Sequence, residues 1–135
     1  MSSPVLLCID DRPQILQVRK TNLEPLGYSV ITATDAATAI AMLEKMEIGA
    51  VLVEYKLEGI DAEAVALHIK QRFPNEPIIL LSAFSDLPER VLWLVDEYVM
   101  RSEPLERLAQ VVERVTHPTA KIAPRSDRLR LKATA

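Results

Sequence analysis

Short apolar runs alternate with helical patterns along the first 117 residues of the chain. Five of these runs are predicted to be strands, and they cover residues 4–9, 28–33, 50–53, 77–81 and 97–100. The first, third and fourth runs are apolar throughout, which is typical of parallel strands that are buried on both faces. The pattern therefore predicts a sheet with at least three interior strands.

The segments that follow the first two runs are predicted to be helices. Pro13 suits the first turn of a helix, and Gly27 stands where a glycine commonly follows the end of one. Thr34 or Asp35 can cap the second helix, and Gly49 is expected to end it.

Three further helices are predicted in the second half. Asp61 can cap the third, a short fourth helix lies near residues 87–94, and Ser102 can cap the fifth. Helical spacing places two apolar stripes on the third and fifth helices: Ala62, Val65, Ala66, Ile69 and Phe73, and Leu105, Leu108, Ala109, Val112 and Val115. Strands that alternate with helices in this way predict an α/β domain with a doubly wound, five-stranded parallel sheet.

Chemically reactive side chains stand directly after four of the predicted strands. They are Asp10 and Asp11 after the first, Glu54 after the third, Ser82 after the fourth and Arg101 after the fifth. In open α/β sheets the binding crevice lies at the carboxyl ends of the strands, so these side chains are expected to converge there. Each has an ordinary structural alternative: Asp11 could cap the next helix, Ser82 could serve a turn, and Arg101 could be a solvated surface cation.

Composition narrows the function classes. The chain has 135 residues, only three glycines and a net charge of −3. The nucleotide-binding motifs G-x-G-x-x-G and G-x-x-x-x-G-K-[ST] are both absent from the sequence. The single cysteine, Cys8, cannot form an internal disulfide. We expect no membrane span, a cytoplasmic location and no nucleic-acid partner.

The charge is unevenly distributed along the chain. Residues 1–117 carry 11 basic and 18 acidic side chains, a net charge of −7, whereas residues 118–135 carry five basic and one acidic, a net charge of +4. We therefore predict a domain over residues 1–117 and a basic, disordered tail over residues 118–135.

Four blocks of sequence resemble the receiver domain of bacterial two-component response regulators. They are C-I-D-D (8–11), V-L-V-E-Y-K-L (51–57), P-I-I-L-L-S-A (77–83) and D-E-Y-V-M-R-S (96–102). Their order and spacing match over residues 4–117. The resemblance implies the flavodoxin-like (βα)5 fold with strand order 2-1-3-4-5.

The resemblance also implies roles for individual residues. Asp10 and Asp11 match the pair that holds Mg²⁺, and the backbone carbonyl of Lys56 matches a further metal ligand. Ser82 matches the hydroxyl that binds the phosphoryl group, and Tyr98 matches the aromatic switch residue.

The chain departs from the family pattern at two positions. Glu54 stands where the phosphoacceptor and metal-binding Asp belongs, and Arg101 stands where the pattern has Lys. A Glu54–Arg101 pair could fill the site without phosphate, with Mg²⁺ bound weakly or not at all. We therefore expect a pseudo-receiver that is not an enzyme. The alternatives are a pair that is merely tolerated, and a receiver that still accepts phosphate from a histidine kinase.

The expected partners are proteins, either a histidine kinase or a downstream output protein. The resemblance implies a face formed by the fourth helix, fifth strand and fifth helix, through which a homodimer could also form. Trp93 is a candidate partner-binding residue near this face, and packing against its own helix is the ordinary alternative.

Overall fold

A five-stranded parallel sheet forms the centre of the molecule. The computed structural model describes residues 3–55 and 58–117. The strands stand in the order β2-β1-β3-β4-β5, which confirms the expected topology. Their bounds are β1 Val5–Ile9, β2 Ser29–Ala33, β3 Ala50–Glu54, β4 Ile78–Ser82 and β5 Glu97–Met100.

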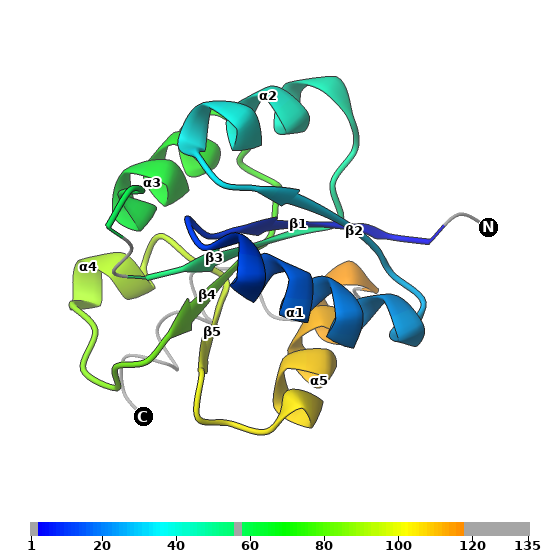
Figure 1. Cartoon of the computed structure of the whole chain (residues 1–135). Coiled ribbons are helices and arrows are strands. Elements are labelled where there is room, and N and C mark those ends of the chain that lie inside the picture. Colours follow the sequence, from blue (N-terminus) through cyan, green and yellow to red (C-terminus); the bar gives the residue numbers. More distant parts are fainter. Residues whose placement is uncertain (1–2, 56–57, 118–135) are drawn as a thin grey trace.

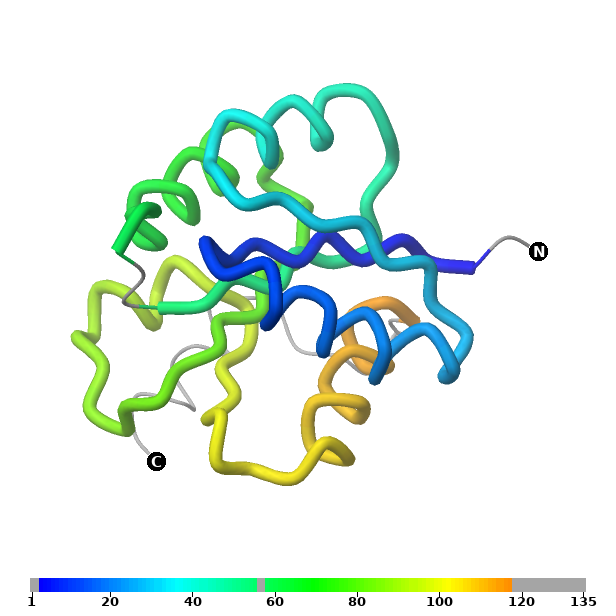
Figure 2. The backbone as a smooth tube through the Cα atoms, viewed as in Figure 1, coloured from blue at the N-terminus to red at the C-terminus, as the bar shows by residue number. Residues whose placement is uncertain are grey.

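Helices cover both faces of the sheet (Figures 1 and 2). Their bounds are α1 Pro13–Leu23, a 3-10 turn η1 Glu24–Leu26, α2 Ala36–Lys45, α3 Ala62–Arg72, α4 Glu89–Leu92 and α5 Leu105–Thr116. Buried side chains of α1 and α5 share one core cluster, and those of α2, α3 and α4 share the other. The sheet is thus doubly wound, as the alternation of apolar runs predicts.

The three apolar runs become the interior strands. Every residue of β3 and β4 is buried, and four of the five residues of β1 are buried as well. Helices on both faces leave no solvent-facing side on these strands, so alternate polar positions would be costly there. This is why β3 and β4 carry polar side chains only at their last residues, Glu54 and Ser82.

Two of the predicted caps are confirmed at the amino ends of α2 and α3. The carboxylate of Asp35 accepts a hydrogen bond from the backbone N–H of Thr38 at 2.7 Å. The carboxylate of Asp61 accepts one from the N–H of Ala64 at 3.0 Å. Gly27 follows η1 with a φ of 103°, a left-handed conformation that favours glycine.

Two predicted helix boundaries are wrong. Ser102 does not cap α5, which begins after Pro104, because residues 100–103 close a separate turn in which the N–H of Glu103 donates to the carbonyl of Met100. Gly49 does not end α2, which stops at Lys45. Gly49 instead lies against β1, where an added Cβ would come within 3.3 Å of the Val5 carbonyl oxygen.

Two predictions fall outside the described residues: the backbone carbonyl of Lys56 and the tail over residues 118–135. Within residues 3–55 and 58–117, none of the helices has the length and apolar character needed to cross a membrane.

Candidate functional site

The strand register brings the predicted site residues together at one edge of the sheet. Ile9 of β1 pairs with Val53 of β3, so the next residues, Asp10 and Glu54, lie at the same level of the sheet. Ser82 pairs with Met100, and the N–H of Arg101 donates to the carbonyl of Ser82 at 2.7 Å. The convergence expected from the chain order is therefore present in the fold.

Glu54 is a buried carboxylate that faces three arginines. Its side chain is 4% exposed, and its Oε1 atom lies 3.6 Å from Nη2 of Arg19 and 3.6 Å from Nε of Arg101. Nη2 of Arg12 lies 4.0 Å from the same oxygen. None of these contacts is a hydrogen bond, so the attraction between Glu54 and the three guanidinium groups is mainly electrostatic.

Burial and the arginines act on the charge of Glu54 in opposite directions. Burial raises the pKa of Glu54 above its ordinary value, and Arg101 and Arg19 offset only part of that rise. Burial likewise lowers the pKa of Arg19, and Glu54 opposes that change. Each group therefore favours the charged form of the other in a place that is poor in water.

Arg12 holds Asp10 through a bidentate ion pair. Its Nε donates to Oδ1 of Asp10 at 3.0 Å and its Nη2 donates to Oδ2 at 3.0 Å. The backbone N–H of Arg12 also donates to Oδ1, at 2.9 Å. Both carboxylate oxygens of the buried Asp10 are thus engaged by one arginine, which is the fork geometry that favours Arg over Lys.

Asp11 links the site to the loop before α3. Its Oδ2 accepts a hydrogen bond from the N–H of Gly59 at 2.7 Å, and its Oδ1 lies 4.0 Å from Nε of Arg12. The N-cap residue of α1 is Arg12, without a side-chain cap. The alternative in which Asp11 caps the next helix is therefore wrong.

The arrangement of these carboxylates does not fit a divalent metal ion. A metal ion needs free carboxylate oxygens, and both oxygens of Asp10 already accept hydrogen bonds from Arg12. The guanidinium of Arg12 lies within 4.0 Å of Asp10, Asp11 and Glu54, which are the acidic residues expected to hold Mg²⁺. Across the described parts of the chain, no group of three or more His, Cys, Asp or Glu side chains is placed to bind a metal.

Ser82 and Tyr98 are both tied to the loop that follows β4. The fully buried Ser82 accepts a hydrogen bond at Oγ from the N–H of Phe84, at 2.9 Å. The hydroxyl of Tyr98 donates to the carbonyl of Phe84 at 2.9 Å. The side chain of Phe84 itself is 50% exposed, so this loop presents an aromatic ring to the surface.

Trp93 lies at the carboxyl end of α4 and is partly buried. Its indole N–H donates to Glu89 of the same helix at 3.4 Å, a long hydrogen bond. Its carbonyl accepts a hydrogen bond from Lys70 of α3 at 3.3 Å. These contacts place Trp93 against its own helix and beside α3.

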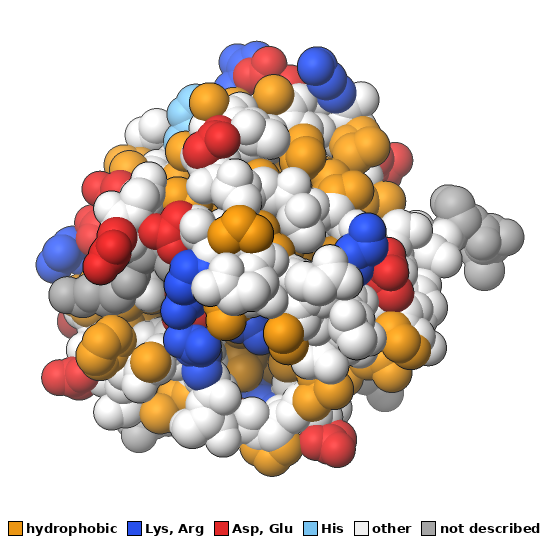
Figure 3. Space-filling view, in the orientation of Figure 1, with side chains coloured by type: hydrophobic (Ala, Val, Ile, Leu, Met, Phe, Trp, Pro, Cys, Tyr) orange, Lys and Arg blue, Asp and Glu red, His pale blue; other side chains and the backbone are white. Residues whose placement is uncertain are grey.

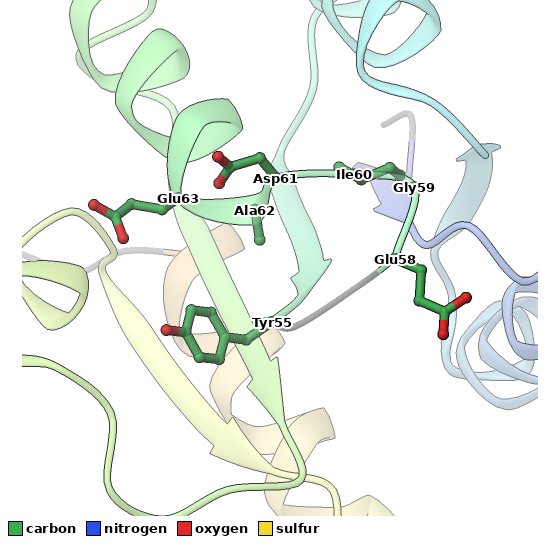
Figure 4. Close-up of a pocket in the computed structure, with 7 residues that line it drawn as sticks. All are labelled: Tyr55, Glu58, Gly59, Ile60, Asp61, Ala62 and Glu63. Carbon is green, nitrogen blue, oxygen red and sulfur yellow. The ribbon is translucent and has the colours of Figure 1, made fainter.

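Acidic side chains also surround a cavity of about 370 Å³ at the start of α3 (Figure 4). Asp61 caps α3, and Glu63 pairs with Arg90 at 3.1 Å. Figure 4 shows Glu58 directed away from both of them. Asp61 and Glu63 thus serve the local structure.

Arg12 and Arg19 are the site residues that sequence reasoning missed. Arg12 directly follows the two strand-end aspartates and contacts three carboxylates. Arg19 lies on the face of α1 that carries the buried Leu16 and Leu23. A cation on an apolar helical stripe needs a buried anion as partner, and this was the available signal.

The fold and the strand-end residues define a flavodoxin-like domain with a charged site at the carboxyl ends of its strands. The sequence profile of the response regulator receiver domain matches residues 6–113. The chain therefore belongs to the response regulator receiver domain family, as the four sequence blocks indicated.

Similar proteins include a probable transcriptional regulator and a response regulator of known structure. The chain is 29% identical over 122 residues to a probable transcriptional regulator, ycf27, of Porphyridium aerugineum, covering 85% of this chain and 50% of that protein. The response regulator TrrA of Thermotoga maritima, solved in complex with Mg²⁺-BeF, is 29% identical with a TM-score of 0.74, covering 83% of this chain and 98% of TrrA. TrrA was also solved in complex with the histidine kinase ThkA, and that chain matches with a TM-score of 0.76 at 28% identity, covering 83% of this chain and 97% of that one. The chain spans about half the length of the ycf27 relative.

Proposed function

We propose that this receiver module of two-component signalling is held in one state by internal ion pairs and is not switched by ordinary aspartyl phosphorylation. The observation that carries the proposal is the buried carboxylate of Glu54, which faces Arg12, Arg19 and Arg101 at 3.6–4.0 Å. The family resemblance assigns Glu54 to the phosphoacceptor position and Arg101 to the Lys position.

The length of the glutamate side chain works against phosphoryl transfer. Glu has one more methylene than Asp, so its carboxylate reaches about 1.5 Å further from the backbone. A displacement near 1 Å can slow a reaction on the order of 10²-fold. The carboxylate of Glu54 is also 4% exposed, which leaves an incoming phosphodonor little access to its oxygens.

Arg12 and Arg101 supply positive charge that a phosphorylated receiver would take from Mg²⁺ and from the Lys of the family pattern. Arg12 stands among Asp10, Asp11 and Glu54, where a metal ion would otherwise neutralise the carboxylates. Arg101 pairs with Glu54 from the end of β5. The site thus has a balanced charge without phosphate or Mg²⁺, and this supports a module that signals through its bound partners.

Protein partners are the natural targets of such a module. We assign it a binding role rather than an enzymatic one, with a histidine kinase or an output protein as partner and no nucleic-acid contact of its own. The complex of the similar TrrA with the kinase ThkA supports this class of partner. The face of α4, β5 and α5 is the proposed contact surface and would also serve a homodimer, with Trp93 at the carboxyl end of α4 as the candidate contact residue. The half-exposed Phe84 lies in the loop after β4, next to Tyr98 of β5.

Acetyl phosphate tests the proposal directly. The protein is incubated with acetyl phosphate and Mg²⁺, and its intact mass is measured before and after acid and base treatment. We expect no addition of a phosphoryl group to the wild-type chain. The matched control carries Arg12→Ala, Glu54→Asp and Arg101→Lys, and we expect it to gain an acid- and base-sensitive phosphoryl group. A labile adduct on Glu54 of the wild type would instead establish a phosphorylatable receiver.

A further inference from the structure

A cavity of about 170 Å³ lies between α1, β5 and the start of α5, beside the strand-end site. Its polar lining includes Arg19, Asn22 and Arg101, and its apolar lining includes Leu81, Val99 and Leu108. Figure 3 shows a hollow in this face of the molecule next to a group of Lys and Arg side chains. The cavity therefore combines two cations with an apolar floor.

The two guanidinium groups have unused hydrogen-bonding capacity. Nη2 of Arg19 and Nε of Arg101 each lie 3.6 Å from Oε1 of Glu54, which is too far for a hydrogen bond. Within the described residues, neither guanidinium donates a hydrogen bond to another side chain. The side chain of Arg19 is only 18% exposed, and a guanidinium with five N–H donors in such a place favours an acceptor close by.

The acidic residue that also lines the cavity is already engaged. Oε2 of Glu103 accepts a hydrogen bond from the N–H of Met100 at 2.7 Å, and its Oε1 lies 3.6 Å from Nε of Arg107. Its negative charge is thus directed to the turn before α5 and to Arg107. Among the residues that line the cavity, Arg19 and Arg101 carry two positive charges against the one negative charge of Glu103.

We propose that this cavity binds a small organic anion. A carboxylate or phosphate head would accept hydrogen bonds from Arg19 and Arg101, and an apolar body would lie on Leu81, Val99 and Leu108. The volume of about 170 Å³ is below the roughly 300–1,000 Å³ of sites for drug-sized ligands, so a nucleotide would not fit. This site goes beyond the proposed function, although it shares Arg19 and Arg101 with Glu54.

Such a ligand would compete with Glu54 for the same cations. Arg19 and Arg101 both lie 3.6 Å from Oε1 of Glu54, so an anion that draws either guanidinium into the cavity weakens its attraction to that carboxylate. Occupancy of the cavity would therefore be coupled to the charge balance of the strand-end site. By reciprocity, removing the charge of Glu54 favours binding of the anion.

The test follows the side-chain Nε–H signals of arginine by ¹H–¹⁵N NMR while the full chain is titrated with small anions. The probes are benzoate, phenyl phosphate, inorganic phosphate and chloride, all at matched ionic strength so that screening is constant. We expect benzoate or phenyl phosphate to shift the Arg19 and Arg101 signals to saturation, with at least about tenfold higher affinity than inorganic phosphate because its ring is buried. The tighter of the two organic anions identifies the preferred head group. Shifts that do not saturate, or that chloride reproduces, would overturn the proposal.

Variants locate the binding. Arg19→Gln is expected to weaken binding at least about tenfold through loss of a charge-assisted hydrogen bond. Asn22→Asp, on the partly exposed side of α1, places a negative charge at the cavity without removing either arginine, and it is expected to weaken binding similarly. Arg72→Gln is the control, because Arg72 is 60% exposed and pairs with Glu44 away from the cavity. Equal effects from Arg72→Gln and Arg19→Gln, or unchanged binding by Asn22→Asp, would refute the site. Glu54→Gln tests the competition and should raise the affinity for the anion. An unchanged affinity in Glu54→Gln would contradict the competition.

Discussion

The ion cluster around Glu54 should make a measurable contribution to stability, which Glu54→Gln removes. At 3.6 Å, the attraction between Glu54 and Arg19 or Arg101 is about 4–5 kcal/mol for an effective dielectric constant of about 20. The cost of taking both partners out of water offsets most of this gain. Breaking a buried pair by removing one partner nevertheless costs about 3–5 kcal/mol, because the other charge stays buried.

Two features of the structure lower this figure. The contacts of Glu54 are not hydrogen bonds, and the side chains of Arg12 and Arg101 are 37% and 36% exposed, so water screens them. Arg19, at 18% exposure, is the cation that would be left without a close anion. We therefore expect Glu54→Gln to lower the free energy of unfolding by about 2–3 kcal/mol.

Urea unfolding, followed by circular dichroism and by the fluorescence of Trp93, measures this loss. The matched control is Glu44→Gln, which breaks the Glu44–Arg72 pair at 3.5 Å between side chains that are 47% and 60% exposed. That change should cost less than about 1 kcal/mol. In a double-mutant cycle, Glu54→Gln and Arg19→Gln should be strongly non-additive. Equal costs for Glu54→Gln and Glu44→Gln would refute the reasoning.

Three further changes test separate parts of the account. Arg12→Ala frees both carboxylate oxygens of Asp10, so Mg²⁺ affinity measured by calorimetry should rise at least about tenfold, and unchanged affinity would contradict the role given to Arg12. Burial raises the pKa of Glu76 to about 8, and repulsion from Asp96 adds to the effect. The stability that protonated Glu76 contributes is therefore fully present below its ordinary pKa of 4.5 and is lost as pH rises through about 8. The free energy of unfolding, measured in urea at low and high pH, should therefore fall less with pH in Glu76→Gln than in the wild type, by on the order of 1–2 kcal/mol. An identical pH profile for the two proteins would count against this role of Glu76. Asp61→Ala removes the cap of α3 and should cost about 1 kcal/mol in the same assay, with Asp61→Asn as the variant that retains most of it.

Much of the fold was readable from the chain because its strands are buried on both faces. The runs at residues 50–53 and 77–81 are apolar throughout, so they are expected in the interior of the sheet, and they form the buried strands β3 and β4. The caps by Asp35 and Asp61 were readable because they depend on neighbours three residues away. The prediction that Ser102 caps α5 was wrong because Glu103 and Met100 exchange hydrogen bonds and close a turn before the helix. The preference of serine for cap positions does not account for this competing turn.

The site was readable in part for a similar reason. Parallel strands end at one edge, so Asp10, Glu54, Ser82 and Arg101 had to meet there. The reach and direction of long side chains are set by packing, and strand order does not give them. The bidentate grip of Arg12 on Asp10 therefore required the structure.

The central claim is that arginine charge stands in the place of a metal ion at the strand-end site. A crystal structure of the chain soaked in Mn²⁺, with an anomalous difference map, tests it most directly because Mn²⁺ reports metal sites that Mg²⁺ would also fill. The account predicts no anomalous peak among Asp10, Asp11 and Glu54, with Arg12 bidentate on Asp10. An ordered Mn²⁺ ion on those carboxylates, with Arg12 turned away from Asp10, would contradict it.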